Sequence, residues 1–291
     1  MHISQPGDKY LISFSRHTWT MTAHPDISEW MDHFGSVMRL KKTDIPIGNQ
    51  ISIIPDSQES TDEIEGKKSR LIQNYYGKYW FYPDNLNICV SLSPETHDDY
   101  KTRSMSFKTL IITLTSVLEP HGAMFLHAAT LVRDNEAVLV AASSGGGKST
   151  TASRIPPPWH APGDECCIVI PAEDGYQVYT LPTWSAVATD PDRTKTWETG
   201  RPYRLKAFCI LKQDTEDEME KVGKAQSIAA ITGSARQAAH IQLDRSGTEI
   251  NQQYFSGCYR TAEEMVQTIP VYLLRTTLTG KFWEKLKQEL W

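Results

Sequence analysis

Short apolar runs separated by polar segments fill the first 100 residues. The stretches 9–21 (KYLISFSRHTWTM) and 49–55 (NQISIIP) combine aliphatic, β-branched and aromatic residues over the length of a strand. The stretch 77–94 (GKYWFYPDNLNICVSLSP) predicts a hairpin that turns around residues 83–85. The polar segment 55–70 is typical of a surface loop or a disordered stretch. This region therefore predicts a β-rich module.

A helical stripe begins near residue 105. The apolar residues Phe107, Leu110, Ile111, Leu114 and Leu118 are spaced i, i+3, i+4, i+7 and i+11, which predicts an amphipathic helix. A proline and a glycine, at positions 120 and 122, predict its end. Two apolar runs, AMFLHAATLV and AVLVAA, then flank the polar RDNE, so we expect two strands joined by a tight turn.

Strands and helices mix over the rest of the chain. KSTTASRI predicts a short helix that PPP ends, and CCIVI, YQVYTL, LKAFCIL and PVYLL predict strands. TAEE at 261–264 has the pattern of a capping box, so a helix is expected to start after Thr261. Phe282, Leu286 and Leu290 predict a C-terminal helix. We therefore expect an α/β domain with one sheet over residues 105–291, preceded by a β-rich domain over residues 1–104 that binds a substrate or partner.

Composition and charge limit the function classes. The chain has 291 residues, 40% of them hydrophobic, and a formal net charge of −5, so we expect neither nucleic acid nor a membrane as partner. The N-terminus lacks the pattern of a signal peptide. The five cysteines form no C-x-x-C pair, which favours reduced thiols and a cytoplasmic protein. Whether the chain forms a homo-oligomer is left open.

The clearest chemical signal is AASSGGGKST at 141–150. Residues 142–149 match the phosphate-binding (Walker A) pattern G-x-x-x-x-G-K-[ST] except for Ala142. Backbone N–H groups of a glycine-rich turn can face an anion, Lys148 can reach the outer phosphates, and Ser149 can ligate Mg²⁺. We predict that ATP with Mg²⁺ binds here; the alternative is a glycine-rich surface turn. The predicted nucleotide-binding residues are Ser143, Ser144, Gly145, Gly146, Gly147, Lys148, Ser149 and Thr150.

Two further groups are candidates for the chemistry. If Asp134 and Asn135 form the turn of the hairpin, paired residue numbers sum to 269, and His127 lies opposite position 142. The alternative for His127 is a hydrogen-bonded core residue. Asp164 and Glu165 stand at the start of an apolar strand, where adjacent side chains face opposite ways. One can orient a hydroxyl nucleophile and the other can hold the metal, unless they are only a hydrated or capping pair.

The order of histidine, phosphate loop and acidic pair resembles the kinase domain of HPr kinase/phosphorylase. The matching residues are His127 in LHAATL, Lys148 and Ser149 in SSGGGKST, and Asp164-Glu165 in PGDECCIVI, where Glu165 stands in place of an aspartate. GRPYRLKAFCILKQDTEDEMEKV and MVQTIPVYLLRTTLTGKFWEKL more closely resemble the HPr kinase-like proteins of peptide-modification gene clusters. These include the SynChlorMet cassette protein ScmC and the lasso-peptide tailoring kinases. The resemblance covers roughly residues 105–291.

This resemblance implies a P-loop fold shared with phosphoenolpyruvate carboxykinase and transfer of phosphate from ATP, with Mg²⁺, to a serine hydroxyl of a peptide or protein. In this scheme Asp164 accepts or orients the hydroxyl proton, His127 tunes it, and Glu165 holds Mg²⁺ with Ser149. An arginine should neutralise the transferring phosphate. We choose Arg201 in the stretch 192–204, which is either a mobile lid or an ordinary solvated loop.

Two other functions stay open. One is a small-molecule kinase or carboxykinase-like enzyme on the same fold. The other is a nucleotide-binding regulatory module without catalysis, which the departures at Ala142 and Glu165 keep open.

Overall fold

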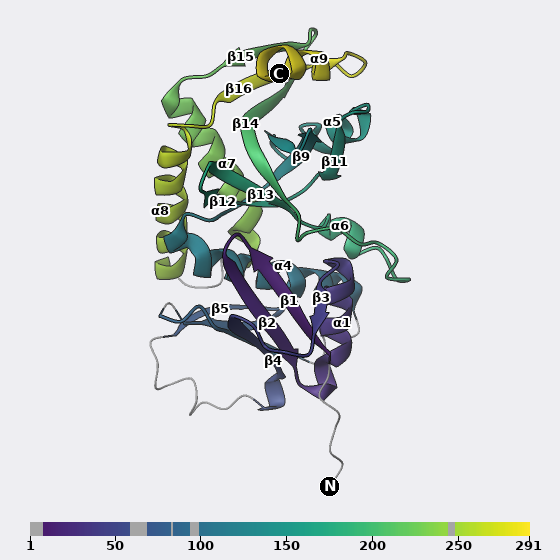
Figure 1. Ribbon diagram of the computed structural model, residues 1–291, viewed down its shortest axis with the longest axis vertical. Helices are drawn as coiled ribbons and strands as arrows, with labels where there is room; N and C mark the ends of the chain where they lie inside the picture. The colour runs from purple at the N-terminus through teal and green to yellow at the C-terminus, as the bar shows by residue number, and fades with distance from the viewer. Residues whose placement is uncertain (1–7, 59–68, 83, 94–98, 244–247) are drawn as a thin grey trace. The chain divides into compact units, whose positions relative to one another are not determined.

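The chain folds into a mixed α/β structure with two mixed sheets, one of them curled into a half-barrel. The computed structural model describes residues 8–58, 69–82, 84–93, 99–243 and 248–291 (Figure 1). Contacts divide the chain into two compact units. Unit 1 comprises Met1–Pro120, Pro182–Gly200 and His240–Tyr254, and unit 2 comprises His121–Leu181, Arg201–Ala239 and Phe255–Trp291.

Unit 1 is built on a seven-stranded mixed sheet in the order β3-β1-β2-β4-β7-β6-β5. Its strands are β1 (Lys9–Phe14), β2 (His17–Ala23), β3 (Lys41–Thr43), β4 (Asn49–Pro55), β5 (Arg70–Asn74), β6 (Gly77–Phe81) and β7 (Ile88–Leu92). Its helices include α1 (Ser28–Val37), α4 (Tyr100–Leu118) and the short α6 (Trp184–Val187). β4 and the β6–β7 hairpin confirm the predictions for 49–55 and 77–94; most of the polar segment 55–70 lies outside the described residues.

Helix α4 is buried on more than the predicted stripe. The ring centroid of Phe107 lies 4.8 Å from that of Trp30 and 5.2 Å from that of Phe34, both on α1. The hydroxyls of Thr113 and Thr115 are also buried, and they donate to carbonyl oxygens four residues earlier, at 2.9 Å each. Such local bonds let the polar face enter an interior without unpaired donors. α4 contacts β6 and belongs to unit 1, so the expected boundary after residue 104 falls inside this helix.

Unit 2 is built on a nine-stranded mixed sheet. The strands are β8 (Met124–Leu126), β9 (Ala128–Arg133), β10 (Glu136–Ala141), β11 (His160–Gly163), β12 (Cys167–Ala172), β13 (Gly175–Thr180), β14 (Pro202–Gln213), β15 (Glu218–Lys221) and β16 (Val271–Thr276). The main path runs β11-β9-β10-β14-β13-β12-β8, and β16 pairs with both β14 and β15. β14 pairs in parallel with both β10 and β16, so the carboxyl ends of the three strands meet at one edge.

The helices of unit 2 include α5 (Lys148–Arg154) and α9 (Phe282–Leu290), with most of α7 (Lys224–Leu243) and the later part of α8 (Thr248–Met265). α5 contacts β9 and β11, and α9 contacts β15 and β16 (Figure 1). Ala152 of α5 and Phe282 of α9 join one buried cluster with β9, β10 and β14. Both helices confirm their predictions.

The predicted helix start after Thr261 is wrong. Thr261 is buried inside α8, which begins at Thr248. Tyr254, Cys258, Ala262 and Met265 are all buried at helical spacing, so one apolar stripe runs through Thr261 without a break. This continuous burial outweighs the local capping pattern.

The hairpin of β9 and β10 has the predicted register. Ala128 pairs with Ala141 and Arg133 with Glu136, and both pairs sum to 269. Asp134 and Asn135 both have positive φ, 51° and 65°, as a type I′ turn requires.

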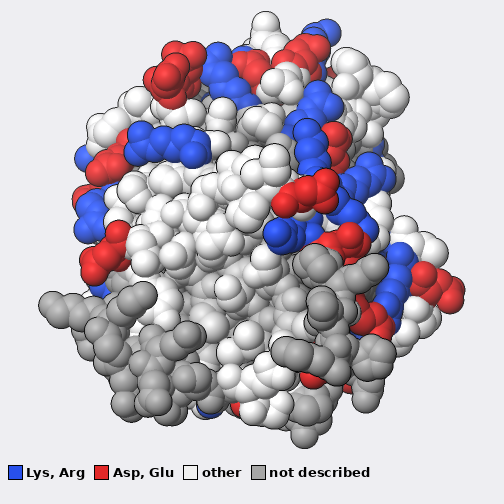
Figure 2. Space-filling view, turned by 60° about the horizontal axis from the view of Figure 1, so that its bottom comes forward, with Lys and Arg blue, Asp and Glu red and all other residues white. Residues whose placement is uncertain are grey.

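The five cysteines are thiols, four of them buried. Within the described ranges, no helix is long and apolar enough to cross a membrane. On the face shown in Figure 2, Lys and Arg side chains lie among Asp and Glu side chains rather than in a separate patch.

Candidate functional site: the glycine loop after β10

The loop 142–147 connects β10 to α5 at the edge where parallel strands end. β10 lies between β9 and β14, and Ala141 pairs with Ile210 near the end of β14. Open α/β sheets bind ligands beyond the carboxyl ends of their strands. The topology therefore places the glycine-rich sequence where such a sheet usually carries its site.

The loop conformation explains two of the three glycines directly. Gly145 and Gly147 have φ of 74° and 95°, a region that other residues enter only with strain. A Cβ on Gly146 would lie 2.8 Å from Cβ of Ala142, so a side chain at 146 needs a rearrangement. Ala142 does not adopt a positive φ. The single departure from the phosphate-loop pattern thus falls at a position whose backbone tolerates a side chain.

Lys148 is the first residue of α5 and is 8% exposed. Its Nζ donates to the carbonyl oxygen of Ala142, 3.2 Å away. Burial lowers the pKa of Lys148, and the charges of Cys166, Glu165 and Asp164 act in the opposite direction. A poorly hydrated ammonium beside a glycine loop is a group that gains from meeting an anionic ligand.

Asp164 and Glu165 lie in a bend between β11 and β12, not on a strand as expected. The expectation that they face opposite ways rested on strand geometry and does not apply to a bend. Both are partly exposed, and both act electrostatically on Lys148. β11 pairs with β9, next to the strand that leads into the loop, and this pairing brings the acidic pair to the site.

His127 lies between β8 and β9, one residue before the paired stretch. Helix α7 fixes its backbone: the N–H of His127 donates to the carbonyl oxygen of Ser234 at 3.2 Å, and Oγ of Ser234 donates to the carbonyl oxygen of His127 at 3.1 Å.

Gln237, one turn further along α7, connects the histidine to the loop. With its amide oriented to suit its neighbours, its nitrogen lies 3.2 Å from the carbonyl oxygen of Ala142 and 3.1 Å from Nδ1 of His127. Its oxygen accepts from the N–H of Ser144 at 3.2 Å. Neither Gln237 nor the helix that carries it was among the predicted features, and no spacing along the chain points to this contact.

The structure does not bring Arg201 to the loop. Arg201 donates to Oδ1 of Asn135 at 3.4 Å and lies over the ring of Tyr203, at the opposite end of β10. Six residues of extended strand separate this end from the loop, about 20 Å at 3.3 Å per residue. The proposed role for Arg201 at the transferring phosphate is therefore corrected. Arg154, on α5, lines a cavity together with Gly146 and Gly147, and its Nη1 donates to the carbonyl oxygen of Thr277 at 2.8 Å.

The side chains that could hold a divalent cation are few. Across the described ranges, no three His, Cys, Asp or Glu side chains gather as a metal site. Ser149 on α5 and the nearby carboxylates supply oxygen donors only. Mg²⁺ is commonly held by one or two such side chains together with substrate phosphates, so this donor set fits a metal that arrives with a nucleotide.

A family model described as SynChlorMet cassette protein ScmC matches residues 88–291. The match covers the glycine loop, the acidic pair, His127 and Gln237. No curated protein matches the chain.

Proposed function

The chain belongs to the SynChlorMet cassette protein ScmC family, and on this premise we propose that it is an HPr kinase-like phosphotransferase. It transfers phosphate from ATP to a serine hydroxyl of a peptide or protein, in a peptide-modification pathway. The observation that carries the proposal is the buried Lys148 directly after a loop with two left-handed glycines, within electrostatic reach of Asp164 and Glu165.

The loop supplies binding and Lys148 supplies charge. The N–H groups of the glycine loop and the ammonium of Lys148 hold the phosphates, and Lys148 offsets negative charge as it develops in the transition state. Bound Mg²⁺ neutralises phosphate oxygens, and Ser149 with Glu165 would hold it.

Asp164 acts on the acceptor. It orients the serine hydroxyl and takes its proton as the hydroxyl oxygen bonds to the γ-phosphorus and the bond to the bridging oxygen breaks. Because Asp164 is in a bend rather than on a rigid strand, a modest change of the bend can bring it to the acceptor. His127, held by α7, lies within hydrogen-bond distance of Gln237 and keeps it in place beside the loop.

The experiment pairs ATP affinity with single-turnover transfer to a serine peptide. Asp164→Asn keeps the shape of the side chain but removes the proton acceptor, so we expect ATP affinity close to wild type and transfer slower by about 10²–10⁴-fold. Asp174→Asn, in the turn before β13, is the matched control and should leave both unchanged.

Transfer at the wild-type rate in Asp164→Asn would exclude this residue as the base. ATP binding without transfer to any serine peptide by the wild type would instead favour the regulatory module, and transfer to a small molecule alone would favour a small-molecule kinase.

A further inference from the structure

A cavity of about 270 Å³ opens beside the glycine loop, at the carboxyl ends of β14 and β16. One wall is formed by the loop and α5, through Gly146, Gly147, Thr150 and Thr151. The opposite wall comes from the residues that follow the two strands, among them Asp214 and Leu278. The volume is close to the lower limit of roughly 300 Å³ for ligand pockets, so it suits one small ring system with its substituents rather than a polymer.

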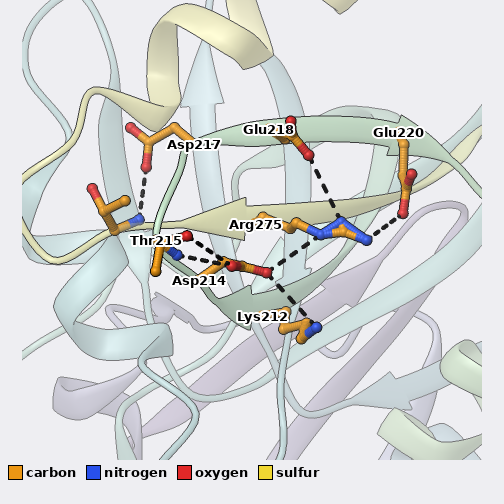
Figure 3. A network of polar contacts seen from close by, with 8 residues as sticks. Lys212, Asp214, Thr215, Asp217, Glu218, Glu220 and Arg275 are labelled. Carbon is orange, nitrogen blue, oxygen red and sulfur yellow. Dashed lines mark hydrogen bonds and ion pairs between the residues drawn. The ribbon is translucent and has the colours of Figure 1, made fainter.

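The far wall carries one carboxylate, Asp214, which belongs to a network of charged side chains. Figure 3 shows Arg275 between three carboxylates, those of Asp214, Glu218 and Glu220, with Lys212 beside Asp214. Nε of Arg275 lies 3.4 Å from Oδ2 of Asp214. The hydrogen bond from the N–H of Thr215 is the main cause that lowers the pKa of Asp214, and the charges of Lys212 and Arg275 act in the same direction. This carboxylate is therefore ionised near neutral pH. An ionised carboxylate repels phosphate and accepts hydrogen bonds from hydroxyl or amino groups.

The loop 277–280 on the same wall is held from two sides. Oδ1 of Asp217 accepts from the N–H of Thr277 at 2.7 Å (Figure 3), and Arg154 donates to the carbonyl oxygens of Thr277 and Gly280. Between these anchors Leu278 is 77% exposed, although it is a large apolar side chain. A fixed loop that presents an exposed leucine at a cavity offers a surface for a flat apolar ring.

We propose that this cavity is the nucleoside subsite of the protein: the phosphates lie on the loop 142–150, the ribose hydroxyls donate to Asp214, and the base packs on Leu278. The inference rests on the proposed nucleotide binding, and it adds where the other end of the nucleotide lies. Polarity sets the direction, because the glycine N–H groups, Lys148 and the cavity-lining Arg154 attract phosphate on the side of the loop and α5, and Asp214 repels it on the opposite wall.

The test compares two ligands, Mg-ATP and Mg-tripolyphosphate, by calorimetry on the full chain. Tripolyphosphate meets only the phosphate loop, whereas ATP also reaches the cavity. Leu278→Ser should weaken ATP binding by about 10-fold, the effect of losing most of one leucine contact, and leave tripolyphosphate binding unchanged. Asp214→Asn should weaken ATP binding and leave tripolyphosphate binding unchanged or tighter, since a repelling charge is removed.

Ile45→Ser is the matched control, because Ile45 is 70% exposed and belongs to unit 1. It should bind both ligands as the wild type does. Unchanged ATP affinity in Leu278→Ser and Asp214→Asn, or an equal loss for both ligands, would overturn the nucleoside subsite. A wild type that binds neither ligand would overturn the proposed nucleotide binding itself.

Discussion

Replacing Lys148 by methionine separates two effects of its charge, one on the stability of the free protein and one on nucleotide affinity. Methionine keeps an unbranched apolar stem of similar length but removes the ammonium. In the free protein that ammonium is 8% exposed and has one hydrogen bond, to Ala142, so burial opposes its charge, as its lowered pKa indicates. The Lys148→Met variant should therefore unfold with a free energy no lower than that of the wild type.

Nucleotide affinity should change in the opposite direction. An ammonium has three N–H groups, so two remain for phosphate oxygens beside the bond to Ala142. Hydrogen bonds to charged groups contribute about 1.5–3 kcal/mol each, and the variant loses at least one of them. Since 1.4 kcal/mol is tenfold, ATP affinity should fall by at least about 10- to 140-fold.

Urea unfolding with and without Mg-ATP measures both effects. ATP at about 100 times the wild-type Kd stabilises the wild type by about 2.7 kcal/mol; for a variant 100-fold weaker, the same concentration gives about 0.4 kcal/mol. Lys206→Met is the matched control, because Lys206 is also partly buried and pairs with Glu136 at 2.6 Å, at the far end of β10. Equal stabilisation of wild type and Lys148→Met by ATP would refute the assignment of the loop. Equal losses in both lysine variants would show a general effect of charge.

Two further predictions concern stability. His33 is buried against Phe107, and burial, together with the charges of Arg193 and Arg103, lowers its pKa from 6.5 to about 4. Between these two pH values the unfolded chain binds a proton that the folded chain does not. The free energy of unfolding should therefore fall by up to ~3 kcal/mol as the pH drops from 6.5 to about 4. His33→Leu should flatten urea unfolding free energies across this window, and a slope equal to that of the wild type would contradict the explanation. Gly147→Ala places a side chain at φ of 95° and should lower the unfolding free energy by about 1–2 kcal/mol. Gly200 has open space around it and no positive φ, so Gly200→Ala should not lower it. Equal effects of the two variants in denaturant titrations would argue against loop strain.

Parts of the site follow from local sequence. The glycines and Lys148 are fixed by their spacing after an apolar strand, and Asp134-Asn135 sets both the turn and the register of the hairpin. Register is a local property, because the turn fixes which residues pair along both strands. His127 could therefore be assigned to the mouth of the loop from sequence alone.

Other parts depend on segments that are distant in the chain. Gln237 reaches His127 across 110 positions because α7 is hydrogen-bonded to the chain between β8 and β9, and no spacing in either segment encodes that contact. Arg201 was misplaced for the same reason: pairing of β14 with β10 and β13 decides which end of the sheet it joins.

The sequence by itself determined the phosphate-type loop, the hairpin before it, most strands and the short and C-terminal helices, because each depends on neighbours within a few residues. Only the tertiary structure decided that α8 runs through Thr261, that Asp164 and Glu165 occupy a bend near Lys148, and that a cavity lies between α5 and the ends of β14 and β16. Burial and long-range strand pairing set these features, and both act between residues that the order along the chain does not bring together.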